Sequence, residues 1–125
     1  MKQLFGMVWK MYKRGEIYLA RLNPRKGNEV GKLRPVLIFQ TDMLNSIGHP
    51  TTTILPLSTK VIENTYPLRY KINSRDALEQ TSDILCDQIR TIDNKRIIDK
   101  KLTTLLHKEM LEISAMVTVV LEIET

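Results

Sequence analysis

The sequence predicts a small, mainly β protein that ends in a helix. Short runs of β-branched and apolar residues follow one another, with turn-forming residues at roughly every eight to twelve positions. The last part of the chain changes period, because its apolar residues recur at steps of three and four. With 125 residues, of which 42% are hydrophobic and 26% charged, the chain suits one domain. Short strands followed by a late helix favour a small barrel or a strongly curved antiparallel sheet.

The first two strands are predicted on either side of a loop. Residues 16–22 (EIYLARL) alternate between two sets of side chains, as a half-buried strand does. Residues 25–32 (RKGNEVGK) contain two glycines and no apolar period, which is typical of a loop. Residues 35–39 (PVLIF) suit a strand that is buried on both faces, with Pro35 only at its beginning.

Further strands are predicted after a polar excursion at residues 41–50, which has room for one helical turn. The run TTTILPL is rich in β-branched residues and predicts a third strand, which Pro56 breaks. Later alternating or apolar runs predict strands at residues 68–72, at 83–89 and, as a short sixth strand, at 96–98.

The C-terminal segment is predicted to be an amphipathic helix. Its apolar residues recur at steps of 4, 3, 4 and 3, which places them on one face. Such a helix covers either the core of its own chain or an interface between two subunits. The residues of this stripe are Leu106, Met110, Ile113, Val117 and Val120.

The first residues are predicted to be an extension of the fold. Their apolar stretch (MKQLFGMVWK) is interrupted by Gly6, ended by Lys10 and not followed by a small-residue cleavage pattern, so it reads poorly as a signal peptide. No apolar run approaches the roughly 20 residues that cross a bilayer, so no membrane partner is expected. We therefore expect an N-terminal extension at residues 1–12 and a single domain at residues 13–125.

Basic side chains are concentrated in the first half of the chain. The net charge is +5, from 19 lysines and arginines against 14 aspartates and glutamates. Residues 1–62 hold ten basic and three acidic side chains, whereas residues 63–125 hold nine basic and eleven acidic ones. This balance makes a nucleic acid a candidate partner.

Cysteine and histidine usage restricts the chemistry. The single cysteine, Cys86, makes an intramolecular disulfide impossible, and a reducing cytoplasm is the expected location. The two histidines, His49 and His107, lie far apart in the sequence and suggest no closed zinc site. A solvated side chain is the expected state of both histidines.

Three sequence segments, in this order, carry a specific resemblance. They are KRGEIYLARLNPRKGNEVGKLRPVLIFQ at residues 13–40, LPLST at residues 55–59 and CDQIRTID at residues 86–93. In these segments, and over residues 13–121 as a whole, the chain resembles the MazF/PemK/Kid family of toxin endoribonucleases (mRNA interferases).

This resemblance implies a fold, an activity and partners. The implied fold is an SH3-like barrel of the PemK/CcdB-like toxin type, with five to seven strands and a C-terminal helix, in a homodimer. Members of the family cut single-stranded RNA, mostly messenger RNA, at short sequence motifs and so inhibit translation and arrest growth. They need no metal ion or other cofactor, and an acidic cognate antitoxin keeps them inactive.

The resemblance also assigns catalytic candidates. Metal-free RNA cleavage uses the adjacent 2′-hydroxyl as nucleophile and leaves a 2′,3′-cyclic phosphate and a 5′-hydroxyl, so the site needs proton-transfer groups and cationic donors around the phosphorus. Arg34 matches the family's RP arginine; its guanidinium is a poor proton acceptor and suits charge stabilisation. Ser58 stands where the family usually has a threonine, with Thr59 as the alternative. Asp87 matches an acidic position and is a candidate to orient Arg34 or to accept the 2′-hydroxyl proton.

Three positions depart from the family pattern. Leu85 stands where one branch has an arginine, and Asn28 where that branch has a histidine, so neither proton relay carries over. Ser58 keeps the hydroxyl of the usual threonine without its methyl group.

Neighbouring polar side chains are candidates for binding RNA. Lysines would attract the phosphate backbone, and loop side chains would read base edges by hydrogen bonds, because aromatic residues make up only 6% of the chain. For Arg90, a structural role at the turn that follows is an alternative. The candidates are Asn28, Glu29, Lys32, Thr59, Lys60, Gln88 and Arg90.

Two other functions compete with RNA cleavage. A toxin of the same shape that binds DNA gyrase without catalysis would not need Arg34, Ser58 and Asp87 together. A degenerate member that binds RNA without cutting it is suggested by the departures at Leu85, Asn28 and Ser58.

Overall fold

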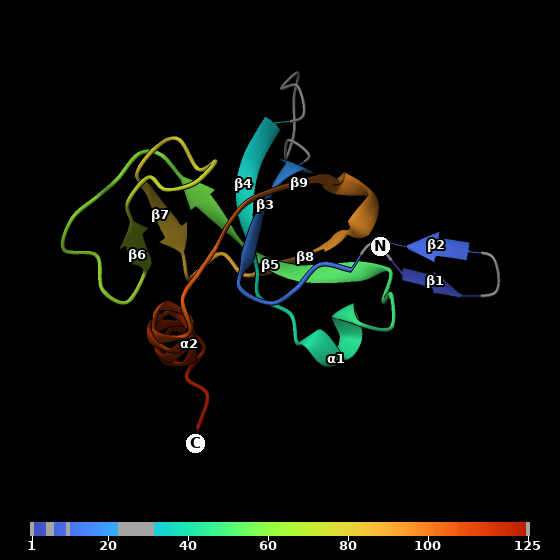
Figure 1. Cartoon of the computed structure of the whole chain (residues 1–125). Helices are drawn as coiled ribbons and strands as arrows, with labels where there is room; N and C mark the ends of the chain where they lie inside the picture. Colours follow the sequence, from blue (N-terminus) through green and yellow to red (C-terminus); the bar gives the residue numbers. More distant parts are fainter. Residues whose placement is uncertain (1, 5–6, 10, 23–31, 125) are drawn as a thin grey trace, which may run out of the picture.

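A computed structural model describes residues 2–4, 7–9, 11–22 and 32–124 of the chain. Within these ranges, seven strands form one antiparallel sheet in the order β6-β7-β5-β4-β3-β9, and β8 pairs with β5 (Figure 1). The mainly β architecture with a C-terminal helix confirms the predicted fold class. The elements are β1 (Lys2–Leu4), β2 (Met7–Trp9), β3 (Glu16–Leu22), β4 (Lys32–Ile38), α1 (Asp42–Asn45), β5 (Thr51–Ser58), β6 (Arg69–Ile72), β7 (Ser82–Leu85), β8 (Arg90–Asp93), a short 3₁₀ helix (Asn94–Arg96), β9 (Ile97–Thr104) and α2 (His107–Leu121).

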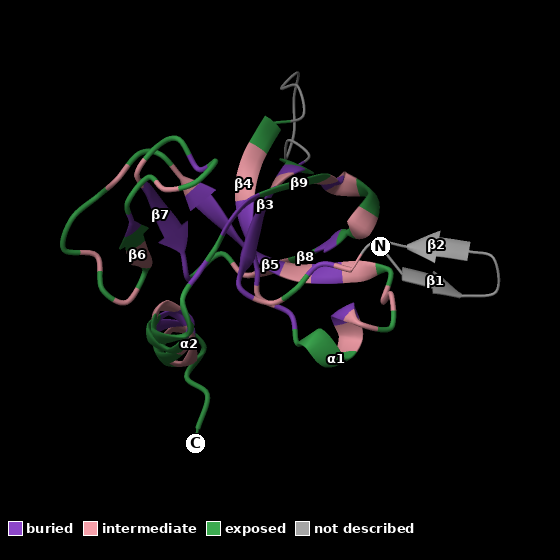
Figure 2. Ribbon diagram, viewed as in Figure 1, coloured by how far each residue is buried: buried purple, intermediate pink, exposed green. Residues whose placement is uncertain are grey.

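The strand at 16–22 has the predicted bounds, but it is buried on both faces rather than on one. Ile17 belongs to a core cluster that includes side chains of α2, whereas Tyr18 belongs to a second cluster with Val36 and Ile54. Figure 2 shows buried residues along the centre of the sheet and on the side of α2 that faces it. The half-buried prediction was wrong because α2 covers the second face, and a strand pattern does not reveal a helix from the far end of the chain.

Helix α2 covers the core of its own chain. Met110, Ile113, Met116 and Val117 are buried in the first cluster. Leu106, which the periodicity placed in the stripe, precedes the helix and is 66% exposed. The helix start is also tied to the loop after β6, because Arg75 forms two hydrogen bonds of 2.7 Å with the Glu109 carboxylate and a third with the carbonyl of residue 104.

Strand β4 extends to both sides of Pro35, so the prediction that Pro35 stands only at the strand's beginning was wrong. The central residues Val36 and Leu37 are fully buried, as expected for a strand covered on both faces. Strand β5 joins β4 only from Val36 onward, whereas β3 pairs with β4 from its first residue. Pro35 therefore has a strand on one side only, and proline is tolerated where its nitrogen faces such an unpaired edge.

Strand β5 runs through Pro56 without a break, contrary to the prediction. Residues 51–54 pair with β8 and residues 57–58 pair with β7, so the second neighbour of β5 changes at Pro56. Of the predicted strand at 83–89, only residues 83–85 lie in a strand, β7. Residues 86–89 connect β7 to β8, a strand that was not predicted. Pro56, which has no N–H group, thus lies where β5 changes its pairing partner. No hydrogen bond between strands is lost at this position.

Strand β9 is longer than the predicted short strand at 96–98, which is the other main correction to the element list. It lies at the end of the strand order and pairs with β3 through two register shifts. Its middle residues are exposed and charged, as is common in edge strands, and they hide the apolar alternation on which the prediction relied.

Two further predictions concern the helical turn after β4 and the N-terminal segment. The predicted helical turn within residues 41–50 is present as α1. Strands β1 and β2 pair with each other and stand apart from the large sheet (Figure 1). The boundary of the N-terminal extension stays a prediction. None of the helices in the described ranges is long and apolar enough to span a membrane.

Candidate active site

Arg34 lies on β4, before the residues at which β4 pairs with β5. The side chain is half-buried, and its Nη1 donates a hydrogen bond of 3.1 Å to the carbonyl oxygen of Leu57. Continuing the β4–β5 register by one residue would set Leu57 opposite Pro35, which has no N–H to donate. The Arg34 side chain therefore supplies a donor to Leu57 where the proline main chain has none.

Ser58 is the last residue of β5 and ends the strand beside Arg34. Ser58 directly follows Leu57, whose carbonyl accepts the hydrogen bond from Arg34. The Ser58 Oγ accepts a hydrogen bond of 3.2 Å from the N–H of Lys60. Because Oγ is the acceptor in this contact, the hydroxyl hydrogen stays available to donate to a ligand.

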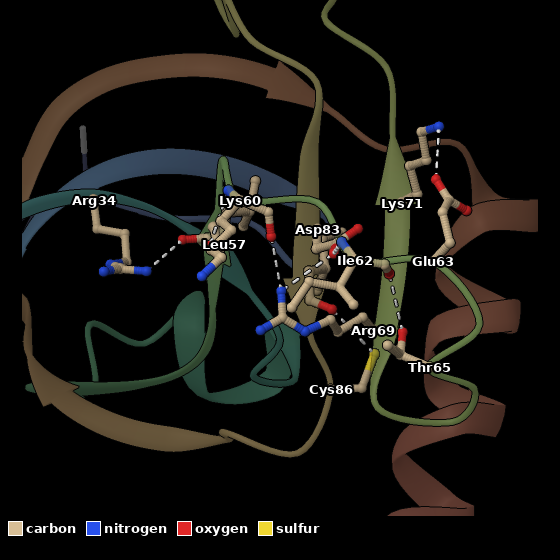
Figure 3. Close-up of polar contacts among 12 residues, drawn as sticks. Arg34, Leu57, Lys60, Ile62, Glu63, Thr65, Arg69, Lys71, Asp83 and Cys86 are labelled. Carbon is tan, nitrogen blue, oxygen red and sulfur yellow. Dashed lines mark hydrogen bonds and ion pairs between the residues drawn. The ribbon is translucent and has the colours of Figure 1, made fainter.

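The Arg34 guanidinium is thus held at the residue directly before Ser58. Figure 3 shows Arg34 reaching toward Leu57, with Lys60 beside it. No partner other than Leu57 is found for the Arg34 guanidinium in the described part of the chain, so further N–H groups are available. Planar guanidinium donors beside a hydroxyl donor match the oxygens of a phosphate group.

Three further predicted residues flank this pair. Lys32 is the first residue of β4, two positions before Arg34, and is exposed. Thr59 and Lys60 follow Ser58 directly and are also exposed. The side chains of Lys32 and Lys60 therefore place two exposed ammonium groups at the edge of the candidate site.

The other predicted residues lie at or beside the turn between β7 and β8. Asp87 and Gln88 are exposed there, and Arg90 is the first residue of β8, opposite Ile54. No ion pair joins Asp87 to Arg34 within the described residues, so Leu57, not Asp87, orients the guanidinium in this structure. Asn28 and Glu29 fall outside the described residues.

Among the described residues, neither Cys86 nor the two histidines form a hydrogen bond with Arg34 or Ser58. Cys86 is fully buried, and burial, with a smaller effect of the Asp87 charge, raises the pKa of its thiol to about 12. His107 is the exposed first residue of α2, as expected. His49 is half-buried, and its carbonyl accepts a hydrogen bond of 2.7 Å from the side chain of Asn94. The described residues hold no group of three or more His, Cys, Asp or Glu side chains that could hold a metal ion.

One pair near Ser58 was missed in the sequence. Asp83 on β7 is opposite Ser58 in register, and its side chain is only 2% exposed. Its Oδ2 is 3.2 Å from Nη1 of Arg69, which also donates to the carbonyl of Lys60 (Figure 3). An acid inside the apolar run DILC was the available signal, because a carboxylate in a buried strand needs a partner.

Comparisons with known proteins show the family of the chain. A model of the family described as "PemK-like, MazF-like toxin of type II toxin-antitoxin system" matches residues 13–121. The chain is 36% identical over 116 residues to Endoribonuclease MazF of Staphylococcus saprophyticus, which covers 92% of this chain and 95% of that protein. It is 39% identical over 101 residues to Endoribonuclease EndoA of Bacillus subtilis, which covers 80% and 84%.

Solved structures share the fold at lower identity. A MazE–MazF crystal structure from Deinococcus radiodurans matches with a TM-score of 0.74 and 17% identity, over 92% of this chain and 99% of that one. The Mycobacterium tuberculosis toxin MazF-mt6 matches with a TM-score of 0.72 and 20% identity, over 88% and 99%. These matches confirm the small toxin fold expected from the sequence.

Proposed function

The chain belongs to the PemK-like, MazF-like toxins of type II toxin–antitoxin systems, and from this premise we propose that it is an endoribonuclease that cleaves single-stranded messenger RNA. Its curated relatives carry the name endoribonuclease at 36–39% identity over most of their length. Cleavage occurs at short sequence motifs without a metal ion and inhibits translation.

The observation that carries this proposal is that the Arg34 side chain is anchored to Leu57, the residue directly before Ser58. Each side chain is held by a main-chain group, Arg34 by the carbonyl of Leu57 and Ser58 by the N–H of Lys60. Donors fixed before the substrate arrives do not have to reorganise when charge develops on the phosphorane oxygens. The pair is therefore suited to stabilising a transition state rather than only attracting an anion.

Each side chain has its own part in the reaction. Arg34 donates N–H groups to the nonbridging phosphate oxygens as negative charge builds up on them. Ser58 donates its hydroxyl hydrogen to the same phosphate group. The 2′-hydroxyl oxygen attacks the phosphorus and its proton passes to a base. The bond to the 5′-oxygen breaks, and that oxygen takes up a proton from the solvent. The products are a 2′,3′-cyclic phosphate and a 5′-hydroxyl.

Asp87 is the proposed base. Its carboxylate is exposed in the turn between β7 and β8, where solvent and substrate reach it. A guanidinium stays protonated at physiological pH and is a poor acceptor, so a carboxylate is the better candidate to take the 2′-hydroxyl proton. Because Asp87 is not bonded to Arg34, the bound RNA itself would bridge the two groups.

Neighbouring polar residues bind the RNA on either side of the cut. Lys32 and Lys60 attract the backbone phosphates, and this attraction weakens as salt rises. Thr59, Gln88 and Arg90 donate to phosphates or to base edges of an unpaired strand. Asn28 and Glu29, which precede β4 in the sequence, complete the proposed contacts.

The proposed assembly is a homodimer that an acidic antitoxin inhibits. The structural neighbour from Deinococcus radiodurans is a MazE–MazF complex, and the fold matches it. A net charge of +5 suits binding of an acidic protein and of RNA. The outer face of α2 leaves Leu111 and Val119 more than half exposed, so it offers apolar surface to a partner.

A cleavage assay on short synthetic RNA, with and without EDTA, tests the proposed function. We expect cleavage to persist in EDTA and to leave a cyclic phosphate end. A 2′-deoxy substitution at the cleaved nucleotide should abolish cutting while the oligonucleotide still binds. Cutting of the deoxy substrate would refute the 2′-hydroxyl mechanism. Binding without any cutting of RNA would favour a degenerate member instead.

A further inference from the structure

Arg69 and Asp83 form an ion pair next to Ser58, because Asp83 is the β7 residue that pairs with Ser58. Their charged atoms lie 3.2 Å apart, and the side chains are 22% and 2% exposed. Asp83 stands in register between Ser58 on one neighbouring strand and Lys71 on the other. Such a buried carboxylate is costly unless it is paired and hydrogen-bonded.

The pair holds the main chain that follows Ser58. The Asp83 Oδ2 accepts a hydrogen bond of 2.9 Å from the N–H of Ile62, and Arg69 Nη1 donates one of 3.0 Å to the carbonyl of Lys60. One carboxylate oxygen and one guanidinium nitrogen therefore fix two points of the loop. Figure 3 shows the Arg69 guanidinium between Lys60 and Asp83.

Lys60 connects this pair to the candidate catalytic hydroxyl. Its carbonyl is held by Arg69, and its N–H donates to the Ser58 Oγ at 3.2 Å. A shift of the Lys60 main chain would therefore move the donor that orients Ser58. The order of contact is Asp83 to Arg69 to Lys60 to Ser58.

A contribution to the stability of the fold does not by itself explain the contacts of Arg69 and Asp83. A buried ion pair is often matched or exceeded in stability by apolar residues of similar volume. The contacts of Arg69 and Asp83 are moreover directed at backbone groups of the loop after β5 rather than at the apolar core. Precise placement of that loop accounts for these contacts better than stability does.

We propose that Arg69 and Asp83 are positioning residues that fix Lys60 and thereby aim the Ser58 hydroxyl at the scissile phosphate. This inference rests on the proposed function, since it assigns a role within RNA cleavage. Because the pair acts through Lys60 and Ser58, its effect falls on the chemical step. A misplacement of about 1 Å at a reacting group can lower a rate by about 100-fold without weakening ground-state binding.

The test compares variants of the full-length chain in steady-state cleavage of one RNA substrate. Asp83→Asn keeps the shape and an acceptor for Ile62 but removes the charge that holds Arg69. Arg69→Met removes both donated contacts, and Arg69→Lys keeps the charge without the fork of donors. The matched control is Glu63→Gln, because Glu63 pairs with Lys71 at 3.4 Å across the same loop and strand but is exposed.

We expect Asp83→Asn and Arg69→Met to lower kcat by about tenfold to 100-fold with KM within about twofold of the wild type. Arg69→Lys should recover part of the lost kcat, and Glu63→Gln should match the wild type. An unchanged kcat at a temperature where the variants are folded, or a raised KM with unchanged kcat, would overturn the inference. If the wild type itself leaves RNA intact, the proposed function fails and this role fails with it.

Amide hydrogen exchange of the wild-type chain tests the contacts without any substitution. The N–H groups of Lys60 and Ile62 should exchange slowly, because the Ile62 N–H is donated to the Asp83 carboxylate and the Lys60 N–H to the Ser58 Oγ, in a main chain that Arg69 holds at the Lys60 carbonyl. Exchange as fast as in an exposed loop would overturn the inference even if no variant folds. In folded Asp83→Asn, both groups should exchange faster than in the wild type.

Discussion

The guanidinium of Arg34 donates a hydrogen bond of 3.1 Å to the main-chain oxygen of Leu57, the residue just before Ser58. This contact crosses from β4 to β5 at the point where their ladder has ended. It therefore fixes a positive charge beside a hydroxyl at the open end of two strands. Functional consequences of this contact can be measured directly.

Substitution of Arg34 should remove activity without unfolding the chain. Arg34→Ala takes away the donors proposed to stabilise the phosphorane, and the loss of one such group costs about 100-fold to 1000-fold in kcat. Arg34→Lys should not restore the rate, because one ammonium cannot hold Leu57 and a phosphate as a planar fork does. Cleavage kinetics measure the effect, and urea unfolding should show a stability change of about 1 kcal/mol. An active Arg34→Ala variant would exclude Arg34 from the site.

Ser58 should be replaceable by threonine but not by alanine. Ser58→Ala removes the proposed donor and the acceptor for the N–H of Lys60, so we expect a loss of about tenfold to 1000-fold in kcat. Ser58→Thr keeps the hydroxyl and should retain activity near that of the wild type. Thr59→Ala is compared at the adjacent exposed position; because Thr59 is proposed to bind RNA, this variant should raise KM and leave kcat near that of the wild type. If Thr59→Ala loses activity and Ser58→Ala does not, the hydroxyl at 59 has the catalytic role.

Substitution of Asp87 should remove most of the activity. A carboxylate can accept the 2′-hydroxyl proton, whereas an amide cannot. Asp87→Asn should therefore lower kcat by about 100-fold or more in cleavage kinetics. If Asp87→Asn retains the wild-type rate, another group is the base.

The link between Arg75 and Glu109 should stabilise the fold in a pH-dependent way. The Arg75 guanidinium, with a smaller contribution from the N–H of Leu106, lowers the pKa of Glu109 below the ordinary value of 4.5. A carboxylate with a lowered folded-state pKa stabilises the fold above the unfolded value, and the stabilisation is lost as pH falls through the folded value. Glu109→Gln should therefore reduce the free energy of unfolding by about 2 kcal/mol near neutral pH and by less in acid.

Urea unfolding of both proteins, at one protein concentration and at several pH values, measures this difference. An equal loss at neutral and acidic pH would show that the charge of Glu109 does not matter.

The thiol of Cys86 should be unreactive while the chain is folded. Burial, together with the nearby Asp87 charge, raises its pKa to about 12 from 9.0, so hardly any thiolate is present at about pH 8. Alkylation followed by mass spectrometry should modify Cys86 only after denaturation. The folded state holds this proton more tightly than the unfolded state, so stability should fall as pH rises from about 9 toward about 12. Rapid labelling of the native chain would contradict this burial.

Local patterns predicted the individual elements well where burial follows a simple rule. The strand at 16–22 and the C-terminal helix were recognisable because their apolar periods of two and of three to four residues are intact. The edge strand β9 was mostly missed because its exposed middle is charged. Pro35 and Pro56 suggested strand boundaries, yet both lie inside strands at points where one neighbour is absent or changes.

The candidate site was predicted only in part. Arg34 and Ser58 stood out through the resemblance to a family, since an isolated arginine or serine carries no such signal. That Leu57 orients Arg34, with no ion pair to Asp87, depends on the pairing register of β4 with β5. The Arg69–Asp83 pair joins residues from two strands to a loop, and only its lone acid in an apolar run was visible in the sequence.

By itself, the sequence determined that this protein is a small basic domain of strands closed by a helix, because period, composition and charge are properties of neighbouring residues. It also determined the family, because three motifs occur in one order. The tertiary structure alone decided which groups meet at the site, since β4, β5 and β7 are brought together by pairing between distant segments. Hydrogen bonds to Leu57 and from Lys60, not the motifs themselves, orient the Arg34 and Ser58 side chains.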